Sequence, residues 1–275
     1  MTTSSEKDID YKYSELKAIL GRMESVAVAF SGGVDSTLLL RVAQMTLGDK
    51  VLAVTAASET TPRHEMEDAR RLAEEFGVRH LIIKSCELEV PEFVKNPEDR
   101  CYICKNRRFS AIIGIAKEQG LSWVADGSNV DDQGDFRPGM RAVRELGVRS
   151  PLLEAGLSKE EIRLLSRGLG LPTWDKPPYA CLATRIPYGN PITAEKLAMV
   201  DAAEDLIRSM SISRQVRVRH YGDTARIEVA RENIVKLLEN ETRERVVAFF
   251  KNLGFKFVTL DLEGYRMGSL NATPS

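Results

Sequence analysis

The sequence predicts an α/β protein with a doubly wound parallel sheet and a smaller C-terminal α+β domain. Over the first 170 residues, short apolar runs alternate with segments of helical periodicity, the pattern of strands joined by crossover helices. Five prolines between residues 171 and 192 then interrupt regular structure. We therefore predict three segments: a nucleotide-binding domain at 1–170, an ordered active-site loop at 171–192, and a substrate or oligomerisation domain at 193–275.

The elements of the first domain follow from periodicity and from helix-start signals. Residues 1–8 are polar and predict a frayed tail, whereas apolar residues at helical spacing predict a helix over 11–23. Apolar runs predict strands at 26–30, 50–56, 78–84 and 122–125. Further helices are predicted from residue 37, at 62–76, at 102–119 and at 158–167, the last with Ser158 and Glu161 as a capping box. Ligands of such sheets bind beyond the carboxyl ends of the strands.

The second domain has a different order of elements. A helix is predicted at 193–209, followed by two strands at 215–221 and 225–229 that a turn at Gly222-Asp223 joins. A helical stretch at 231–252 and a last strand at 256–262 complete it. The mixture predicts a small α+β domain.

Composition excludes several classes of protein. The net charge is −1 and the estimated pI is 6.4, so no overall basic field argues for nucleic acid. We found no apolar run that approaches a membrane span, and the polar start does not resemble a signal peptide. We expect a soluble cytoplasmic protein, in which four cysteines suit a metal site or catalysis better than a disulfide framework.

The turn after the first strand has the composition of a phosphate site. Glycines allow a ligand to approach the backbone, serines supply hydroxyls, and the free N–H groups of the following helix favour an anion. The Lys-Ser/Thr of the common P-loop is missing, so this is a different phosphate loop. A plain glycine turn with an N-cap serine is the simpler alternative. The residues of the turn are Ser31, Gly32, Gly33, Val34, Asp35 and Ser36.

A second polar turn follows the strand at 122–125. Its sequence runs from Asp126-Gly127 to Asp131-Asp132. The two adjacent carboxylates could hold Mg²⁺ on ATP phosphates, because Mg²⁺ takes one or two carboxylates together with phosphate oxygens and water. An Asx-rich solvated turn is the alternative.

Three of the four cysteines lie in sequence contexts that favour chemistry. Cys101 and Cys104 begin a helix beside basic residues, which stabilise thiolates, and Cys181 lies in the proline-rich loop. Three thiolates can hold a [4Fe–4S] cluster with one open iron. A structural zinc would need a fourth ligand, such as Cys86, His64, His80 or His220. A redox Cys-x-x-Cys pair is a third possibility, and burial as small apolar residues, which suits Cys86, is the simplest.

An arginine pair marks the second domain. In the strand at 215–221, alternation places Arg217 and Arg219 on one face. Together with Arg185 they could bind an anionic substrate through forked hydrogen bonds. A solvated sheet face with Glu228 as the ion-pair partner on the neighbouring strand is the alternative.

The whole chain resembles one branch of the PP-loop ATP pyrophosphatases, the adenine nucleotide α-hydrolase-like enzymes that cleave ATP between its α and β phosphates. The phosphate turn, the Asp126-Gly-Ser-Asn-Val-Asp-Asp132 turn, the cysteine loop and the Arg-Val-Arg-His strand resemble the LarE family. These ATP-dependent sulfur transferases act in nickel-pincer nucleotide biosynthesis.

The resemblance implies a reaction. ATP would adenylylate a carboxylate of pyridinium-3,5-biscarboxylic acid mononucleotide with release of pyrophosphate, and sulfur would then displace AMP to leave a thiocarboxylate. It implies catalytic roles for Cys181, Asp35 and Arg185, and pyrophosphate binding by residues 31–36 with Gly127. It also implies substrate binding by Arg217, Arg219 and Glu228.

Cys101 and Cys104 depart from the single-cysteine pattern, in which Cys181 would surrender its own sulfur. They resemble the three-cysteine members, which implies a [4Fe–4S] cluster that delivers sulfide from a source the sequence does not identify. The family resemblance also implies trimers paired into hexamers. A PP-loop tRNA thiolation enzyme and a non-catalytic nucleotide sensor are the alternative functions, although the near-neutral charge argues against RNA.

Overall fold

The computed structural model describes residues 4–134, 138–178 and 180–266. The chain forms two compact units. The first comprises Met1–Ser58, Arg63–Glu87 and Asp99–Pro178, and the second comprises Glu59–Pro62, Leu88–Glu98 and Tyr179–Ser275. The second unit therefore takes up two short segments from the first half of the chain. Each unit has its own sheet.

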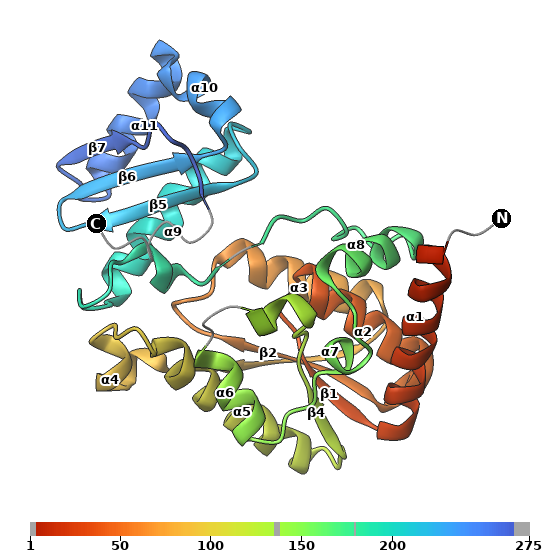
Figure 1. Cartoon of the computed structure of the whole chain (residues 1–275). Coiled ribbons are helices and arrows are strands. Elements are labelled where there is room, and N and C mark those ends of the chain that lie inside the picture. Colours follow the sequence, from red (N-terminus) through yellow and green to blue (C-terminus); the bar gives the residue numbers. More distant parts are fainter. Residues whose placement is uncertain (1–3, 135–137, 179, 267–275) are drawn as a thin grey trace. The chain divides into compact units, whose positions relative to one another are not determined.

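The first unit contains a four-stranded parallel sheet with the order β3-β2-β1-β4 (Figure 1). Its strands are β1 (Val26–Ala29), β2 (Val51–Ala57), β3 (Arg79–Lys84) and β4 (Trp123–Ala125). Its helices are α1 (Ser4–Met23), α2 (Val34–Leu47), α3 (Arg63–Glu75), α5 (Arg100–Glu118), α6 (Pro138–Glu145), α7 (Pro151–Glu154) and α8 (Lys159–Gly168). Short 3₁₀ turns occur at η1 (Gly48–Lys50) and η3 (Val130–Gly134), and η2 (Glu87–Glu89) spans the boundary with the second unit.

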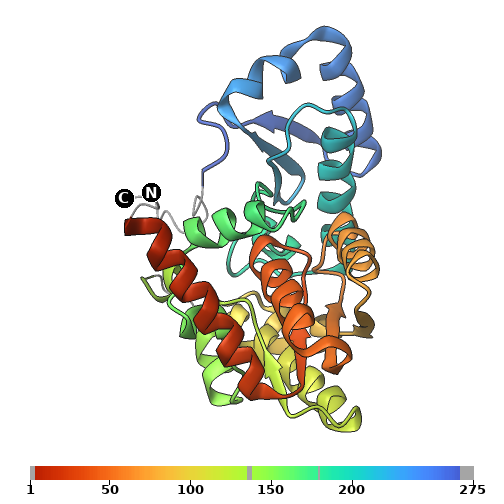
Figure 2. The ribbon, with the colours of Figure 1, turned by 90° about the vertical axis from the view of Figure 1, so that its right-hand side faces the viewer.

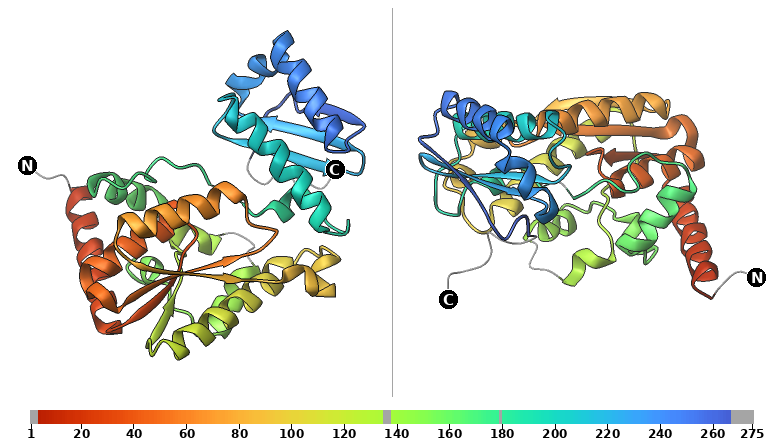
Figure 3. Two further views of the ribbon diagram at one scale, coloured as in Figure 1. Left: turned by 180° about the vertical axis from the view of Figure 1, so that it is seen from behind. Right: turned by 90° about the horizontal axis from the view of Figure 1, so that it is seen from above.

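Helices cover both faces of this sheet, which confirms the predicted doubly wound architecture. Val26 and Val28 of β1 belong to a core shared with α1, α2, α3 and α8, whereas Ala27 belongs to a second core shared with α5 and α6. β2 alternates in the same way, with Ala53 in the first core and Leu52 in the second. A strand buried on both faces must be apolar throughout, and that is why these strands appear as continuous apolar runs. The rear view in Figure 3 shows the helices on the two sides of the sheet.

The second unit is a smaller α+β fold. β5 (Val216–Tyr221) pairs with β6 (Thr224–Val229) in antiparallel fashion, and β6 pairs with β7 (Phe257–Leu260) in parallel. Figure 2 shows this sheet with its helices. These are α4 (Pro91–Val94), α9 (Ala194–Ser209), α10 (Ile234–Leu238) and α11 (Asn240–Asn252), with the 3₁₀ turns η4 (Leu182–Arg185) and η5 (Arg231–Asn233). Gly222 takes φ +66° in the predicted two-residue turn, a conformation that favours glycine.

Some element boundaries differ from the predicted ones. Residues 4–8 form the first turns of α1, so a frayed tail was the wrong prediction for them, although they are polar; residues 1–3 lie outside the described part of the chain. The helix after the phosphate turn begins at Val34 rather than at 37, so it includes half of the turn motif. The predicted helix at 231–252 is interrupted at Glu239, whose backbone is extended. No helix among the described residues has both the length and the apolar character needed to cross a membrane.

Candidate active site

The predicted phosphate turn lies between β1 and α2, at the carboxyl end of a central strand. α2 begins at Val34, with Gly33 as an N-cap that supplies no side-chain hydrogen bond. The first helical bond runs from the Thr37 N–H to the Gly33 carbonyl, at 3.0 Å. The N–H groups of residues 34–36 therefore lack acceptors within the helix, and together with the helix dipole they favour an anion.

Two serine hydroxyls lie beside this helix end. The Oγ atoms of Ser31 and Ser36 are 3.0 Å apart. Ser31 Oγ also accepts the Gly33 N–H at 3.3 Å, and Ser36 Oγ donates to the Gly33 carbonyl at 3.3 Å. The turn thus gathers two hydroxyls and a backbone N–H next to the helix N-terminus.

Two glycines are required by close packing. Gly32 has φ +70°, and a Cβ on it would lie 3.1 Å from the backbone nitrogen of Ala69 in α3. A Cβ on Gly127 would lie 3.0 Å from the backbone nitrogen of Ser36. Gly127 therefore lets the second polar turn approach the start of α2, as expected from the meeting of strand ends at one sheet edge.

Asp35 is the centre of a polar network at the phosphate turn. Its carboxylate accepts Lys159 Nζ at 2.5 Å and Asn129 Nδ2 at 3.3 Å. Lys159 is the first residue of α8, whose predicted N-terminal capping box, formed by Ser158 and Glu161, is confirmed. The contacts of Lys159 and Asn129 with Asp35 depend on packing between segments far apart in the chain, so the local sequence pattern does not predict them.

The second polar turn is held by its own side chains and by α8. The buried Asp126 carboxylate accepts hydrogen bonds from the Ser128 hydroxyl at 2.6 Å and from the Ser150 hydroxyl at 2.7 Å. Asp131 accepts the Lys159 backbone N–H at 2.6 Å, and Asp132 accepts the Asn129 backbone N–H at 3.0 Å. Both predicted magnesium ligands therefore also have a structural use.

Despite these contacts, Asp131 and Asp132 have the ligand chemistry that Mg²⁺ prefers. Each N–H occupies one oxygen of its carboxylate, and Asp131 is exposed while Asp132 is half-buried. Mg²⁺ needs no more than one or two carboxylates when phosphate and water complete its shell. The donor set of Asp131 and Asp132 thus suits a metal that arrives with ATP.

Lys176 of the proline-rich segment reaches the phosphate turn. Its ammonium group donates to the Gly32 carbonyl at 3.1 Å and to Asp68 at 2.8 Å, and it lies 3.1 Å from Glu65. Burial raises the pKa of Asp68, but the hydrogen bond and charge of Lys176 outweigh it and lower that pKa. No motif or periodicity predicts this contact of Lys176. The signal in the sequence is a lysine within the proline-rich loop, close to the aromatic and cysteine residues that predict an ordered functional segment.

Cys101 and Cys104 both lie in the first two turns of α5. Their spacing of three places them on one side of the helix, with Cys101 exposed and Cys104 half-buried. Cys104 Sγ lies 3.7 Å from Glu87 Oε1, which Arg108 Nε also contacts at 2.5 Å. Burial raises the pKa of Glu87, but Arg108 outweighs that effect and lowers it. Glu87 thus balances the charge of Arg108, one of the basic residues that follow the two cysteines in α5.

Cys181 precedes η4 in the second unit and is half-buried. The fully buried Arg185 side chain donates to the Cys181 carbonyl at 3.1 Å and to the Ala180 carbonyl at 2.7 Å. The same guanidinium forms a forked pair with Glu204, at 2.7 and 2.9 Å. Arg185 thereby positions the backbone of the Cys181 segment, and its direct participation in catalysis stays a prediction.

The arginine strand is buried rather than solvated. Arg219 forms a forked pair with Glu228, at 3.0 and 2.8 Å, so the ion pair of the alternative interpretation is present, but the strand face is buried and not solvated; substrate binding by these residues stays a prediction. Arg217 is also buried, donates to the Val216 carbonyl and lies over the Tyr265 ring. Burial, and next the nearby Arg185 charge, lower the pKa of Arg217 to about 10. That lowering marks a buried cation that an anionic ligand would stabilise.

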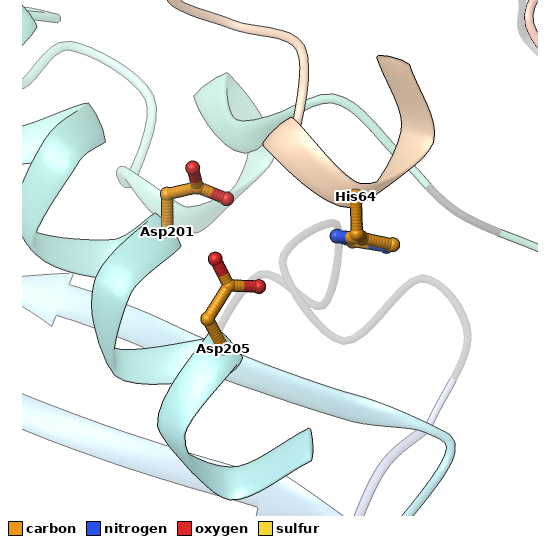
Figure 4. Close-up of side chains that lie close together, drawn as sticks. All are labelled: His64, Asp201 and Asp205. Atoms are coloured by element: carbon orange, nitrogen blue, oxygen red, sulfur yellow. The ribbon is translucent and has the colours of Figure 1, made fainter. Parts of the chain in front are cut away.

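The histidines that we considered as a fourth zinc ligand lie in three different parts of the fold, and two of them contact side chains other than cysteine. His80 Nε2 lies 2.7 Å from Thr55 Oγ1, and His220 packs against the Phe255 ring. His64 lies in the first turn of α3, and Asp201 and Asp205 extend from one face of α9 (Figure 4). Cys86, for which burial was expected, is half-buried.

A cavity of about 530 Å³ lies beside the second polar turn. Asp132, Ser150, Met140, Arg141 and Arg144 are among its lining residues. Asp132 is the lining residue that belongs to the predicted site, so this cavity adjoins the phosphate turn network through that carboxylate.

Comparison with known proteins supports the PP-loop assignment. A family model described as NAD synthase matches residues 20–90, which contain the phosphate turn. The chain is 28% identical to a glutamine-hydrolyzing GMP synthase of Aeropyrum pernix, over 67% of this chain and 40% of that protein.

Two relatives match nearly the whole chain. One is an uncharacterized protein of Synechocystis, 43% identical over 96% of this chain and 98% of that protein. The other is the pyridinium-3,5-bisthiocarboxylic acid mononucleotide synthase of Lactiplantibacillus plantarum, 40% identical over 95% of this chain and 94% of that protein. The chain therefore belongs to the family of that synthase, the LarE family of PP-loop proteins.

Proposed function

We propose that this protein is an ATP-dependent sulfur transferase that converts a carboxylate of pyridinium-3,5-biscarboxylic acid mononucleotide into a thiocarboxylate. The observation that carries the proposal is the uncapped N-terminus of α2 beside Ser31 and Ser36, in a chain of this family. This geometry suits binding of the pyrophosphate that leaves when ATP is cleaved between its α and β phosphates.

The first step activates the carboxylate. A carboxylate oxygen of the substrate attacks the α-phosphorus of ATP, the bond from that phosphorus to the bridging oxygen breaks, and pyrophosphate leaves with both bonding electrons. The N–H groups of residues 34–36 and the two serine hydroxyls stabilise the negative charge that develops on it. Asp131 and Asp132 would hold Mg²⁺, which neutralises phosphate charge.

The second step replaces oxygen by sulfur. A sulfur nucleophile attacks the acyl carbon, and the bond from carbon to the AMP oxygen breaks, so that AMP leaves. Arg217 suits recognition of the substrate phosphate, because it is a buried cation with a lowered pKa. Arg219, whose guanidinium is held by Glu228, would support it from the same strand face.

The source of the sulfur is a separate part of the proposal. Cys101, Cys104 and Cys181 would hold a [4Fe–4S] cluster, whose chemistry when bound is to carry an additional sulfide on its open iron. The exposed Cys101 and the half-buried Cys104 on one side of α5 suit that use. In the alternative, the Cys181 thiolate attacks the acyl carbon and AMP leaves, which gives a thioester. Loss of the Cys181 Cα proton then breaks the Cβ–S bond, so that the sulfur stays on the product as a thiocarboxylate and Cys181 becomes dehydroalanine, with no iron required.

The reaction is tested by measuring pyrophosphate and AMP release with and without the pyridinium mononucleotide. Both products should depend on that substrate, and Asp35→Asn should reduce them, because Asp35 joins the phosphate turn to Lys159 and Asn129. Release without the substrate would contradict the proposal, as would thiolation of tRNA under the same conditions.

The sulfur source is tested by iron and acid-labile sulfide analysis of anaerobically purified protein. We expect about four irons per chain, lost in Cys101→Ala. Cys86→Ala is the matched control, because it removes a half-buried thiol of the same unit outside the proposed ligand set. Absence of iron with one product per Cys181 thiol would favour the sacrificial route instead.

A further inference from the structure

We infer that Lys176 is a positioning residue of the pyrophosphate site, and that Arg163 holds Lys176 in place. The inference rests on the proposed function, because it concerns the same phosphate turn. It assigns a role to two cations that lie outside the glycine and serine motif.

Lys176 fixes the orientation of one peptide group in the phosphate turn. Lys176 Nζ donates to the Gly32 carbonyl at 3.1 Å. In a trans peptide the carbonyl and the next N–H point in opposite directions, so fixing the Gly32 oxygen also fixes the Gly33 N–H. That N–H points to the Ser31 hydroxyl, which in turn contacts Ser36. Lys176 thus directs a donor toward the side of the turn where the two hydroxyls meet.

Lys176 also neutralises negative charge beside the phosphate turn. Its side chain is 12% exposed, and its ammonium nitrogen lies 2.8 Å from Asp68 and 3.1 Å from Glu65. Without the lysine, Asp68 would keep Arg71 as its ion-pair partner, at 3.0 Å, but both carboxylates of α3 would lose the cation that also contacts the phosphate turn. They would then repel a bound pyrophosphate through a partly buried environment, where charges are weakly screened.

Arg163 in turn holds the backbone on either side of Asp175, next to which Lys176 lies. Arg163 donates to the Trp174 carbonyl at 2.6 Å and to the Lys176 carbonyl at 2.9 Å. Arg163 lies four residues after Lys159 on α8, so both cations extend from one side of that helix. α8 therefore contacts the phosphate turn at two places, directly through Lys159 and Asp35 and indirectly through Arg163 and Lys176.

The test measures binding of ATP and of inorganic pyrophosphate, each with Mg²⁺, by calorimetry. Lys176→Ala should weaken pyrophosphate binding by roughly 10- to 100-fold, the range for loss of a charged hydrogen bond. It should raise the KM for ATP more than it lowers kcat. Lys176→Arg should recover part of the loss, because it keeps the charge. Lys176→Gln serves as a second variant if the alanine protein does not fold.

Arg163→Ala should weaken binding in the same direction but less, and the double variant should be no worse than Lys176→Ala, because both residues act through the same contact. Lys12→Ala is the matched control. Lys12 is also a partly buried, ion-paired lysine that contacts α8, through Glu161 at 2.7 Å, and its removal should leave pyrophosphate affinity unchanged.

A folded Lys176→Ala protein with wild-type affinity would overturn the inference and leave the proposed function intact. If Lys176 were only a structural link between α3 and the loop, its loss would reduce stability without changing that affinity. Weakened pyrophosphate binding without substrate-dependent AMP release would instead support the inference and contradict the proposed reaction. Wild-type protein that binds neither probe would overturn both.

Discussion

Gly32 is the residue of the phosphate turn that tolerates least change. Its positive φ disfavours any other side chain, and Ala69 of α3 fills the space that a Cβ would need. Gly48 also has a positive φ, of +59°, but nothing lies within 4 Å of a Cβ placed on it. An alanine at Gly48 would therefore add backbone strain alone, whereas an alanine at Gly32 would add both backbone strain and steric overlap with α3.

We expect Gly32→Ala to abolish measurable pyrophosphate release and to lower the free energy of unfolding by about 1–3 kcal/mol, since it adds a backbone clash to a strained conformation. Gly48→Ala should show the strain cost alone and keep activity. Urea unfolding and a pyrophosphate assay on both variants make the comparison. Equal activity of the two alanine proteins would mean that α3 yields without disturbing the turn.

Glu204 and Arg185 form a buried ion pair at the base of the Cys181 segment, and both side chains are fully buried. Burial raises the pKa of Glu204, but the charge and hydrogen bonds of Arg185 outweigh it and lower the pKa from 4.5 to about 2. That lowering corresponds to about 3 kcal/mol of stability. Because the folded pKa lies below the unfolded one, this contribution is present above pH 4.5 and is lost as the pH falls toward 2.

Glu204→Gln should therefore destabilise the second unit by about 3–5 kcal/mol at neutral pH, because it leaves Arg185 buried without a counter-charge. The free energy of unfolding of the variant should also depend less on pH between 4.5 and about 2, because the variant lacks the carboxyl group that titrates there. Hydrogen exchange of the Val218 amide, which donates to Glu204 at 2.9 Å, gives a local measurement. Glu263→Gln, which removes an exposed partner of Arg266, is the control and should leave that exchange rate unchanged.

At the scale of elements, α8 is the helix that organises the phosphate turn. Its N-terminus is capped by Ser158, and it also donates the Lys159 N–H to Asp131. Asp131 therefore has two possible uses, as a partner of this helix end and as a magnesium ligand. The two uses predict different results on substitution.

We expect Asp131→Asn to raise the Mg²⁺ concentration needed for half-maximal pyrophosphate release, and Ser158→Ala to leave it unchanged. Both should cost about 1 kcal/mol of stability, because each weakens the start of α8. Titration of Mg²⁺ at saturating ATP, together with urea unfolding, separates the effects. If the asparagine protein shows the wild-type Mg²⁺ requirement, Asp131 acts as a helix partner alone.

The elements were largely predictable because their signals are local. Apolar runs buried on both faces specified the strands, and Ser158 with Glu161 specified the start of α8. The site was predictable where a motif carries the backbone geometry itself, as at Gly32. The site was not predictable where it depends on a side chain that contacts a residue far away in the sequence. Lys176 reaches Gly32 across 144 positions of sequence, and no periodicity encodes that distance.

Burial of charge was the other part that sequence could not supply. Alternation placed Arg217 and Arg219 on one strand face but could not show that this face is covered. The family resemblance predicts a catalytic role for Arg185, whereas its forked contact with Glu204 exists only because α9 packs against η4. The presence of an arginine in the sequence does not show whether its partner is a ligand, water or a buried carboxylate.

At the scale of the whole molecule, the two units have separate hydrophobic cores. The core of the second unit contains Val216, Ile227, Phe250 and Phe255, and the cores of the first surround β1 and β2. Both tryptophans, Trp123 and Trp174, belong to the first unit. Tryptophan fluorescence therefore reports on the first unit, and hydrogen exchange in β5 and β6 reports on the second.

We expect Phe250→Ala, which empties a fully buried position, to destabilise the second unit by about 3–5 kcal/mol. Exchange of the β5 and β6 amides should become faster, while the urea midpoint followed by tryptophan fluorescence stays at the wild-type value. Leu40→Ala, in the core of the first unit, should show the reverse pattern. If Phe250→Ala shifts both signals together, the units unfold as one cooperative structure. The substrate binding that we propose for the arginine strand would then stabilise the phosphate turn as well.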